Sequence, residues 1–214
     1  SAEIFNPSTK PWTPAGTLAH ARSGHQAILL VDGRVLVVAG KDEEFRTIAA
    51  AEIYDPSTGS WASAGNMAQA REDYTATRLS NGRVLVVGGR GEDADEGGRT
   101  FASAEVYDPR TNSWSAAGTL AQSRGAHWAV PLPDGRVLVV GGFEGEGFEF
   151  RSLASAEIYD ASSNSWSPSG TLGQARGAHR AILLPDGRVL VVGGDGVTTE
   201  IYNPATGRWT FSDP

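Results

Sequence analysis

The sequence predicts an all-β fold built from repeated four-stranded sheets. The first observation is a repeat of about 50 residues, marked by tryptophans, glutamates and arginines that recur in one order. The second is the abundance of turn formers, because 27 glycines and 11 prolines among 214 residues favour many short strands. The repeated positions are Trp12, Trp61, Trp114, Trp166 and Trp209, then Glu3, Glu52, Glu105, Glu157 and Glu200, and finally Arg22, Arg71, Arg124 and Arg176.

Within one period the sequence indicates four strands. Residues 24–30 form the first, and the dipeptide Asp32-Gly33 that follows favours a type I′ hairpin turn. The second strand, residues 35–38, is apolar on both faces and is therefore expected to be buried on both. Residues 51–54 form the third strand, and the fourth carries the tryptophan.

A sheet with two apolar faces cannot bury itself, and stacking such sheets around an axis produces a β-propeller. Each tryptophan is then expected between adjacent sheets, where burial of ~150–250 Å² stabilises the fold by roughly 4–6 kcal/mol. The chain is predicted to be one propeller domain or propeller fragment. It comprises a leftover N-terminal two-stranded half-blade, 1–14, and four complete four-stranded blades, at about 22–64, 71–117, 124–169 and 176–212.

This count leaves three arrangements open. The chain is a piece of a larger propeller, or it closes as a small ring with one incomplete blade, or several chains associate edge to edge. Unpaired strand edges and an exposed blade face favour association, so a homo-oligomer is one expected outcome.

The Gly-Gly pair that ends the second strand, the tyrosine that follows it and the spaced tryptophan together resemble the kelch-repeat family. Gly88-Gly89, Tyr107 and Trp114 show the pattern in one repeat, and the likeness covers essentially the whole chain. The resemblance implies a kelch-type β-propeller, a fold that usually has more blades and often closes by pairing strands from the two chain ends. The motifs Ala-Arg-x-x-His and Asp-Gly-Arg-Val-Leu-Val-Val-Gly-Gly are similar to those of bacterial kelch repeats. We therefore expect a bacterial protein, secreted or of the cell envelope.

Composition excludes several classes of function. The net charge is −7 and only Lys10 and Lys41 are lysines, which argues against a nucleic-acid partner. Apolar runs stay short of the ~18 residues that a membrane span requires. The sequence has no cysteine, and the copper site of galactose-oxidase-like kelch propellers needs a cysteine linked to a tyrosine. We therefore expect no metal and no cofactor.

Comparison of the repeats with one another separates structural from candidate functional positions. A residue present in every blade is expected to be structural, which assigns the arginine, glutamate and tryptophan columns to the scaffold; the alternative is an arginine ring that grips an anion. His25, His127 and His179 share a column with Tyr74, and a structural role is preferred over metal ligation there.

The next column, on the predicted innermost strand, differs in every blade. It reads Gln26, Thr75, Trp128 and Arg180. Trp128 is the one tryptophan out of phase with the repeat, so it either fills a wide part of the central channel or is a binding platform near the channel. Trp128 and Arg180 are therefore candidate binding residues.

The segments between the second and third strands also vary, and alternating strand direction places them all on one face. We call residues 41–49, 90–101, 143–153 and 195–198 the loop face; their net charges of −1, −2, −2 and −1 supply six of the seven net negative charges. Exposed aromatic residues beside charges are typical of protein interfaces, although acidic loops also serve solubility alone. The candidate binding residues are Phe45, Arg46, Glu92, Asp93, Asp95, Phe101, Phe148, Phe150 and Arg151.

These observations favour a non-enzymatic binding or scaffold module that holds a protein, a peptide or a glycan on the loop face. No nucleophile, base and orienting residue come together by motif, so no catalytic residue is predicted. The alternative is a mutarotase-like, carbohydrate-active enzyme acting at the central channel. A further alternative is an excised or engineered propeller fragment without activity of its own.

Overall fold

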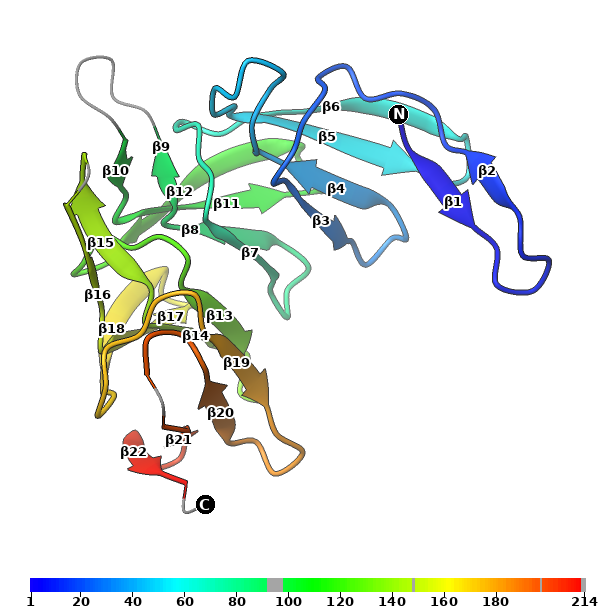
Figure 1. The fold of residues 1–214 in the computed structure, drawn as a ribbon. Helices are drawn as coiled ribbons and strands as arrows, with labels where there is room; N and C mark the ends of the chain where they lie inside the picture. Colours follow the sequence, from blue (N-terminus) through cyan, green and yellow to red (C-terminus); the bar gives the residue numbers. More distant parts are fainter. Residues whose placement is uncertain (92–97, 148, 197, 213–214) are drawn as a thin grey trace.

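The computed structural model describes residues 1–214 except 92–97, 148, 197 and 213–214 (Figure 1). The described residues contain β-strands joined by turns and no helix, which confirms the predicted all-β class. It follows that no helix in the described part of the chain could cross a membrane.

Four antiparallel four-stranded sheets form the blades, and their strands fall where the repeat placed them. Blade 1 contains β3 (Gln26–Leu29), β4 (Val35–Val38), β5 (Ala50–Asp55) and β6 (Ser60–Asn66); blade 2 contains β7 (Thr75–Arg78), β8 (Val84–Val87), β11 (Ser103–Asp108) and β12 (Ser113–Thr119). Blade 3 contains β13 (Trp128–Pro131), β14 (Val137–Val140), β17 (Ser155–Asp160) and β18 (Ser165–Thr171); blade 4 contains β19 (Arg180–Leu183), β20 (Val189–Val192), β21 (Glu200–Asn203) and β22 (Arg208–Phe211). A two-stranded sheet of β1 (Glu3–Phe5) and β2 (Trp12–Pro14) forms the half-blade.

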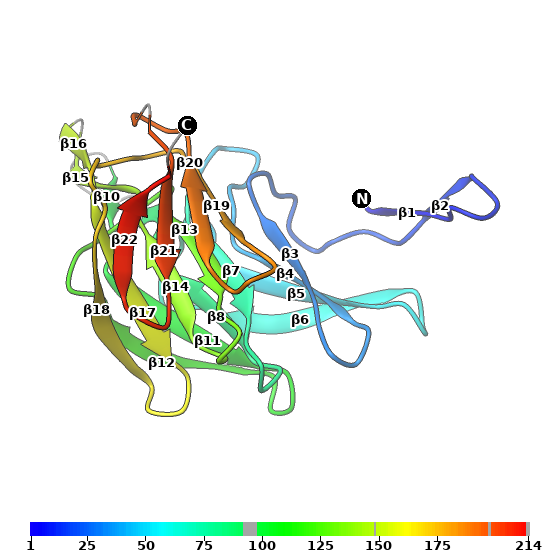
Figure 2. The ribbon, with the colours of Figure 1, turned by 90° about the horizontal axis from the view of Figure 1, so that it is seen from below.

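The blades follow one another around an arc (Figure 1). Strands β3, β7, β13 and β19, the first of each blade, line its concave side, and the two ends of the described chain lie at opposite ends of the arc. Figure 2 shows the half-blade projecting away from blade 1. The innermost position predicted for the first strand of each period is therefore the one observed.

The core lies between the blades. The Val-Leu-Val-Val strands β8 and β14 are wholly buried because a neighbouring blade covers each face. Each blade also places a tryptophan against the preceding one, as Trp114 and Trp166 donate their indole N–H groups to the carbonyls of Ala64 and Ala117 at 2.9 and 2.7 Å. The expected tryptophan position between sheets is thus reached by packing and by a hydrogen bond.

The Gly-Gly pairs allow the chain to leave the second strand beside the start of the first. Gly142 has φ +91°, and a Cβ atom there would lie 2.5 Å from the carbonyl oxygen of Gly125. A larger residue would therefore push this segment away from the start of the first strand of its own blade.

A fifth four-stranded sheet was not expected from the sequence. It contains β9 (Arg90–Gly91), β10 (Arg99–Thr100), β15 (Phe143–Glu146) and β16 (Glu149–Ser152), in the order β16-β15-β10-β9. Two segments of the loop face, one from blade 2 and one from blade 3, therefore pair with each other instead of forming separate loops. We call this the loop-face sheet.

Candidate binding site on the loop face

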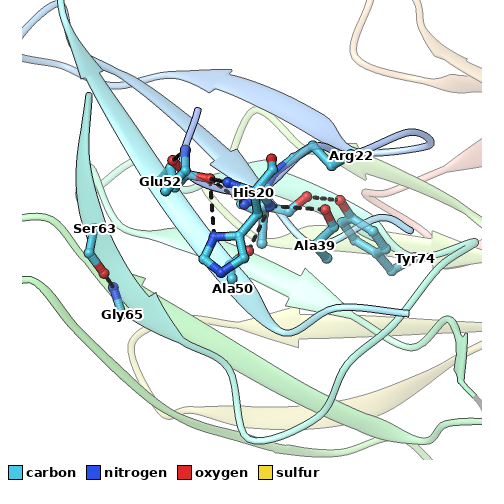
Figure 3. A network of polar contacts seen from close by, with 10 residues as sticks. His20, Arg22, Ala39, Ala50, Glu52, Ser63, Gly65 and Tyr74 are labelled. Atoms are coloured by element: carbon cyan, nitrogen blue, oxygen red, sulfur yellow. Dashed lines mark hydrogen bonds and ion pairs between the residues drawn. The ribbon is translucent and has the colours of Figure 1, made fainter. Parts of the chain in front are cut away.

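The repeated arginines and glutamates form a buried ion pair in each blade. In blade 1, Arg22 bonds Glu52 at 2.6 Å and donates to the carbonyls of Ala39 and Ala50 at 3.0 and 2.7 Å (Figure 3). Glu52 also accepts the backbone N–H groups of Ala19 and His20 at 2.6 and 3.2 Å. The same pairs recur as Arg71–Glu105, Arg124–Glu157 and Arg176–Glu200, at 2.8, 2.9 and 2.8 Å.

These guanidinium groups are buried and engaged in structural contacts. The side chains of Arg71, Arg124 and Arg176 have no exposed surface, and burial lowers the pKa of Arg71 while the charge of Glu105 opposes the shift. Each arginine ties the start of the first strand to the second and third strands of its own blade. An anion has no access to such a group.

The histidine column joins neighbouring blades. Tyr74 donates its hydroxyl to the carbonyl of Val38 in blade 1 at 2.5 Å, and His127 contacts the hydroxyl of Thr75 in blade 2 at 2.8 Å. Trp128 takes the position of Thr75 in the next repeat, and neither buried ring nitrogen of His179 has a hydrogen-bond partner in the described part of the chain. Within those residues no cluster of histidine, aspartate or glutamate could hold a metal ion.

The variable column on the concave side also links one blade to the next. The Gln26 amide donates to the Tyr74 carbonyl at 2.6 Å and accepts the Ala76 N–H at 3.0 Å, which joins β3 to β7. The Arg180 guanidinium lies 4.7 Å from the centre of the Trp128 ring. A cation–π contact of this kind occupies one face of the indole, a surface on which a sugar would otherwise stack.

The loop-face sheet has one charged and one apolar face. Cross-strand pairing puts Glu144 opposite Arg151 and Glu146 opposite both Glu149 and Arg99, so these side chains share a face. They surround a groove of about 780 Å³. Within it, Arg151 forms an ion pair with Glu144 although its side chain is 72% exposed.

The opposite face of this sheet is aromatic. The rings of Phe143 and Phe150 meet edge to face at 5.2 Å, and the guanidinium of Arg90 lies 6.0 Å from the Phe150 ring. Arg90 is itself held by Glu72 and Asp73 at 3.1 and 3.0 Å. Phe150 remains 38% exposed, so an aromatic edge is available beside the charged groove.

A second loop presents Phe45. Asp42 organises this loop by accepting the N–H groups of Glu44 and Arg46 at 3.0 and 2.9 Å and by pairing with the Arg46 guanidinium at 3.0 Å. These bonds, with the Arg46 side chain, hold the pKa of Asp42 below its usual value. Phe45 sits at the turn with φ +62° and is 73% exposed.

The other predicted binding residues are placed differently. Phe101 lies over the Arg71 guanidinium at 5.5 Å and is half-buried, so it covers the blade 2 ion pair and is not an exposed anchor. Glu92, Asp93, Asp95 and Phe148 lie outside the described residues. Arg99, Glu144, Glu146 and Glu149 line the groove and were missed; alternation on both sides of Gly147 is the hairpin signal that could have found the three glutamates.

Known proteins resemble this chain through its repeats. The family profile described as the KLHDC2/KLHL20/DRC7 Kelch-repeats domain matches residues 2–208. The chain is 30% identical to Kelch-like protein 35 of Mus musculus over 115 residues, covering 51% of this chain and 19% of that protein. It is 31% identical to Kelch-like protein 34 of Homo sapiens over 121 residues, covering 55% and 19%.

An enzyme also shares part of the repeat. Galactose oxidase of Gibberella zeae is 32% identical over 83 residues, covering 36% of this chain and 11% of the enzyme. The chain therefore spans about a fifth or less of the length of these relatives.

Proposed function

The chain belongs to the kelch-repeat family, and from that premise we propose that it is a non-enzymatic binding module that holds a protein or peptide on the loop face. The observation that carries the proposal is the loop-face sheet. It departs from the repeat, yet it is ordered by strand pairing and by aromatic and charged contacts. A pre-ordered surface with exposed aromatic and charged groups loses little entropy when a partner binds.

The groove beside this sheet favours a peptide or protein segment over a small apolar molecule. Its lining alternates Arg99 and Arg151 with three glutamates, so both signs of charge are offered to a ligand. Charged pairs around an aromatic anchor are the arrangement that gives protein interfaces their specificity. The copper chemistry of galactose oxidase has no support here, because the sequence lacks cysteine.

Selection from a phage-displayed random peptide library on the immobilised chain tests the proposal. The key variant combines Phe150→Ala with Glu149→Gln on the loop face. The matched control is Val31→Ser. Val31 is an exposed residue in the turn between β3 and β4, on the side of blade 1 opposite its loop-face segment. We expect clones that bind wild type and the control equally and bind the loop-face variant at least about tenfold more weakly. Failure to enrich any clone, or equal binding to all three proteins, would contradict the proposal.

The carbohydrate-active alternative depends on Trp128. With Arg180 over one face of the indole, a sugar could stack on it only by using the other face or by displacing the guanidinium. Turnover of a sugar by wild type that is lost in Trp128→Ala would support this alternative against the binding module. No turnover across a panel of aldoses and their glycosides would remove it.

A further inference from the structure

We propose that β16 receives an extended segment of a partner protein as an added antiparallel strand, with an apolar residue opposite Phe150, a basic residue opposite Glu149 and an acidic residue opposite Arg151. This rests on the proposed function, because it assigns the partner's chemistry at the same loop face. The observations are the free edge of the loop-face sheet, the direction of its backbone groups and the order of charges along it.

β16 is the outermost strand of this sheet. The order β16-β15-β10-β9 leaves it paired with β15 alone among the described residues. Of its four residues, Glu149, Phe150 and Arg151 are exposed. An exposed edge strand is the structure to which another chain can add by main-chain hydrogen bonds.

The backbone groups of Phe150 point out of this edge. The N–H of Phe143 donates to the Gly125 carbonyl at 2.9 Å, and the Phe143 carbonyl accepts the Gly125 N–H at 2.8 Å. Both groups therefore point away from β16, and the cross-strand pair of Phe143 with Ser152 is not hydrogen-bonded. Hydrogen-bonded and non-hydrogen-bonded pairs alternate in an antiparallel ladder, which makes Gly145–Phe150 another non-hydrogen-bonded pair.

The partners of Gly145 support this direction independently. Both its backbone N–H and its carbonyl bond the hydroxyl of Thr100, at 3.1 and 3.2 Å, on the side away from β16. Phe150 therefore presents one donor and one acceptor at the free edge. A single residue of an antiparallel partner strand can satisfy both.

The side chains specify the residues of that strand. Glu149 lies directly opposite Glu146 on β15, and like charges in such a pair repel each other. Glu146 also faces Arg99 on β10, whereas the outer side of Glu149 is open to an added strand. A cation opposite Glu149 would relieve this repulsion, and an apolar residue opposite Phe150 would extend the aromatic face that begins with Phe143.

Arg151 completes the pattern. Its side chain is already paired with Glu144, but most of it is exposed, so its guanidinium can pair with a second carboxylate. Because an antiparallel strand meets Arg151 first and Glu149 last, the partner reads acidic–apolar–basic from its amino end. The reverse order places like charges opposite both residues.

Fluorescence anisotropy with a labelled peptide Thr-Val-Glu-Val-Lys-Val-Thr provides the test. We expect saturable binding to wild type. A peptide with glutamate and lysine exchanged, or one N-methylated at the central valine, should bind at least about tenfold more weakly, because either two charges clash or a main-chain bond is lost. N-methylation at the glutamate, whose N–H points away from β16, should change little.

Two protein variants separate the backbone from the side chain. Phe150→Pro removes the edge N–H that an added strand needs and is compatible with an edge strand, whereas Phe150→Ala keeps this group and removes the ring. We expect the proline variant to abolish binding and the alanine variant to weaken it. Glu149→Lys should reverse the preference between the two charge orders. The unfolding midpoint of each variant verifies that it is folded.

The outcomes distinguish the two proposals. If the peptide fails to bind at millimolar concentration, or if Phe150→Pro and the peptide N-methylated at the central valine behave like their parents, strand addition is wrong. Library-selected peptides that still require Phe150 and Glu149 would then retain the proposed function alone. If neither kind of peptide depends on the loop face, both proposals fail.

Discussion

The blade cores and the loop-face sheet lie next to each other but are stabilised in different ways. In the cores, the same arginine–glutamate pair recurs in every blade and the arginine side chains of blades 2 to 4 have no exposed surface. In the loop-face sheet, Arg151 and Glu144 pair once, and the arginine is mostly exposed. This difference indicates that residues repeated in every blade are those that the fold requires. Residues that differ between blades lie on surfaces that can take other roles.

The comparison is tested most strongly by removing one arginine from each region. Arg124→Ala leaves Glu157 buried without its cation, and we expect the free energy of unfolding to fall by about 3–5 kcal/mol. Arg151→Ala removes an exposed partner and should cost ~0–1 kcal/mol. Urea unfolding followed by tryptophan fluorescence measures both. Equal losses in the two variants would mean that burial does not distinguish the regions.

The buried histidines make a pH-dependent prediction for the cores. Burial, together with the charge of Arg176, lowers the pKa of His179 to about 4, and burial with the charge of Arg124 lowers the pKa of His127 well below its usual value. The unfolded chain takes up these protons near pH ~6.5, whereas the folded chain keeps the rings neutral. The free energy of unfolding is therefore free of this penalty above pH ~6.5 and falls as the solution is acidified towards pH 4.

For His179 the loss should reach about 3 kcal/mol at pH 4. Blade 2 supplies the matched substitution, since Tyr74 occupies the same column and bonds Val38. His179→Tyr should remove its share of the pH dependence between pH ~6.5 and 4, as measured by urea unfolding at a series of pH values. An unchanged slope in this variant would show that other groups cause the loss.

The blade interfaces predict a smaller effect for the tryptophans. Trp166→Phe removes the hydrogen bond to Ala117 and part of a packed ring, and we expect a loss of about 1–2 kcal/mol. The Trp12 ring lies tilted against Phe5 at 5.2 Å, as its counterparts lie against tyrosines, but Trp12 is 62% exposed. Trp12→Phe should therefore change stability by less than ~0.5 kcal/mol. A comparable loss at both positions would indicate that the half-blade is packed in solution.

Much of the fold could be predicted because the repeat compares the chain with itself. Turn dipeptides such as Asp134-Gly135, the Val-Leu-Val-Val strands and the tryptophan spacing each recur, so each strand was supported several times. The β10–β15 pairing could not be found in this way. It joins Arg99 to Glu146 across blades, through short segments that occur once and whose register depends on the surrounding fold.

The aromatic residues of the loop face show the same limit of the repeat. Phe101 and Phe150 are both aromatic residues in non-repeated segments, and the sequence gives no basis for separating them. The fold places Phe101, half-buried, over Arg71 and leaves Phe150 38% exposed on the edge strand β16. Which aromatic residue is accessible is therefore decided by tertiary packing.

Phe45 offers the mildest test, in which stability and binding should change in opposite directions. A bulky residue at φ +62° is strained, and its ring recovers little by burial because it is 73% exposed. Phe45→Asn should raise the free energy of unfolding by up to about 1 kcal/mol, since asparagine adopts this conformation more readily. Phe45→Ala keeps the strain and removes the ring, so it should leave the free energy of unfolding nearly unchanged. Both variants should weaken the binding of any partner that contacts this loop. A stability gain in both variants would attribute the effect to the exposed ring, and a loss in both would show that Phe45 supports the fold.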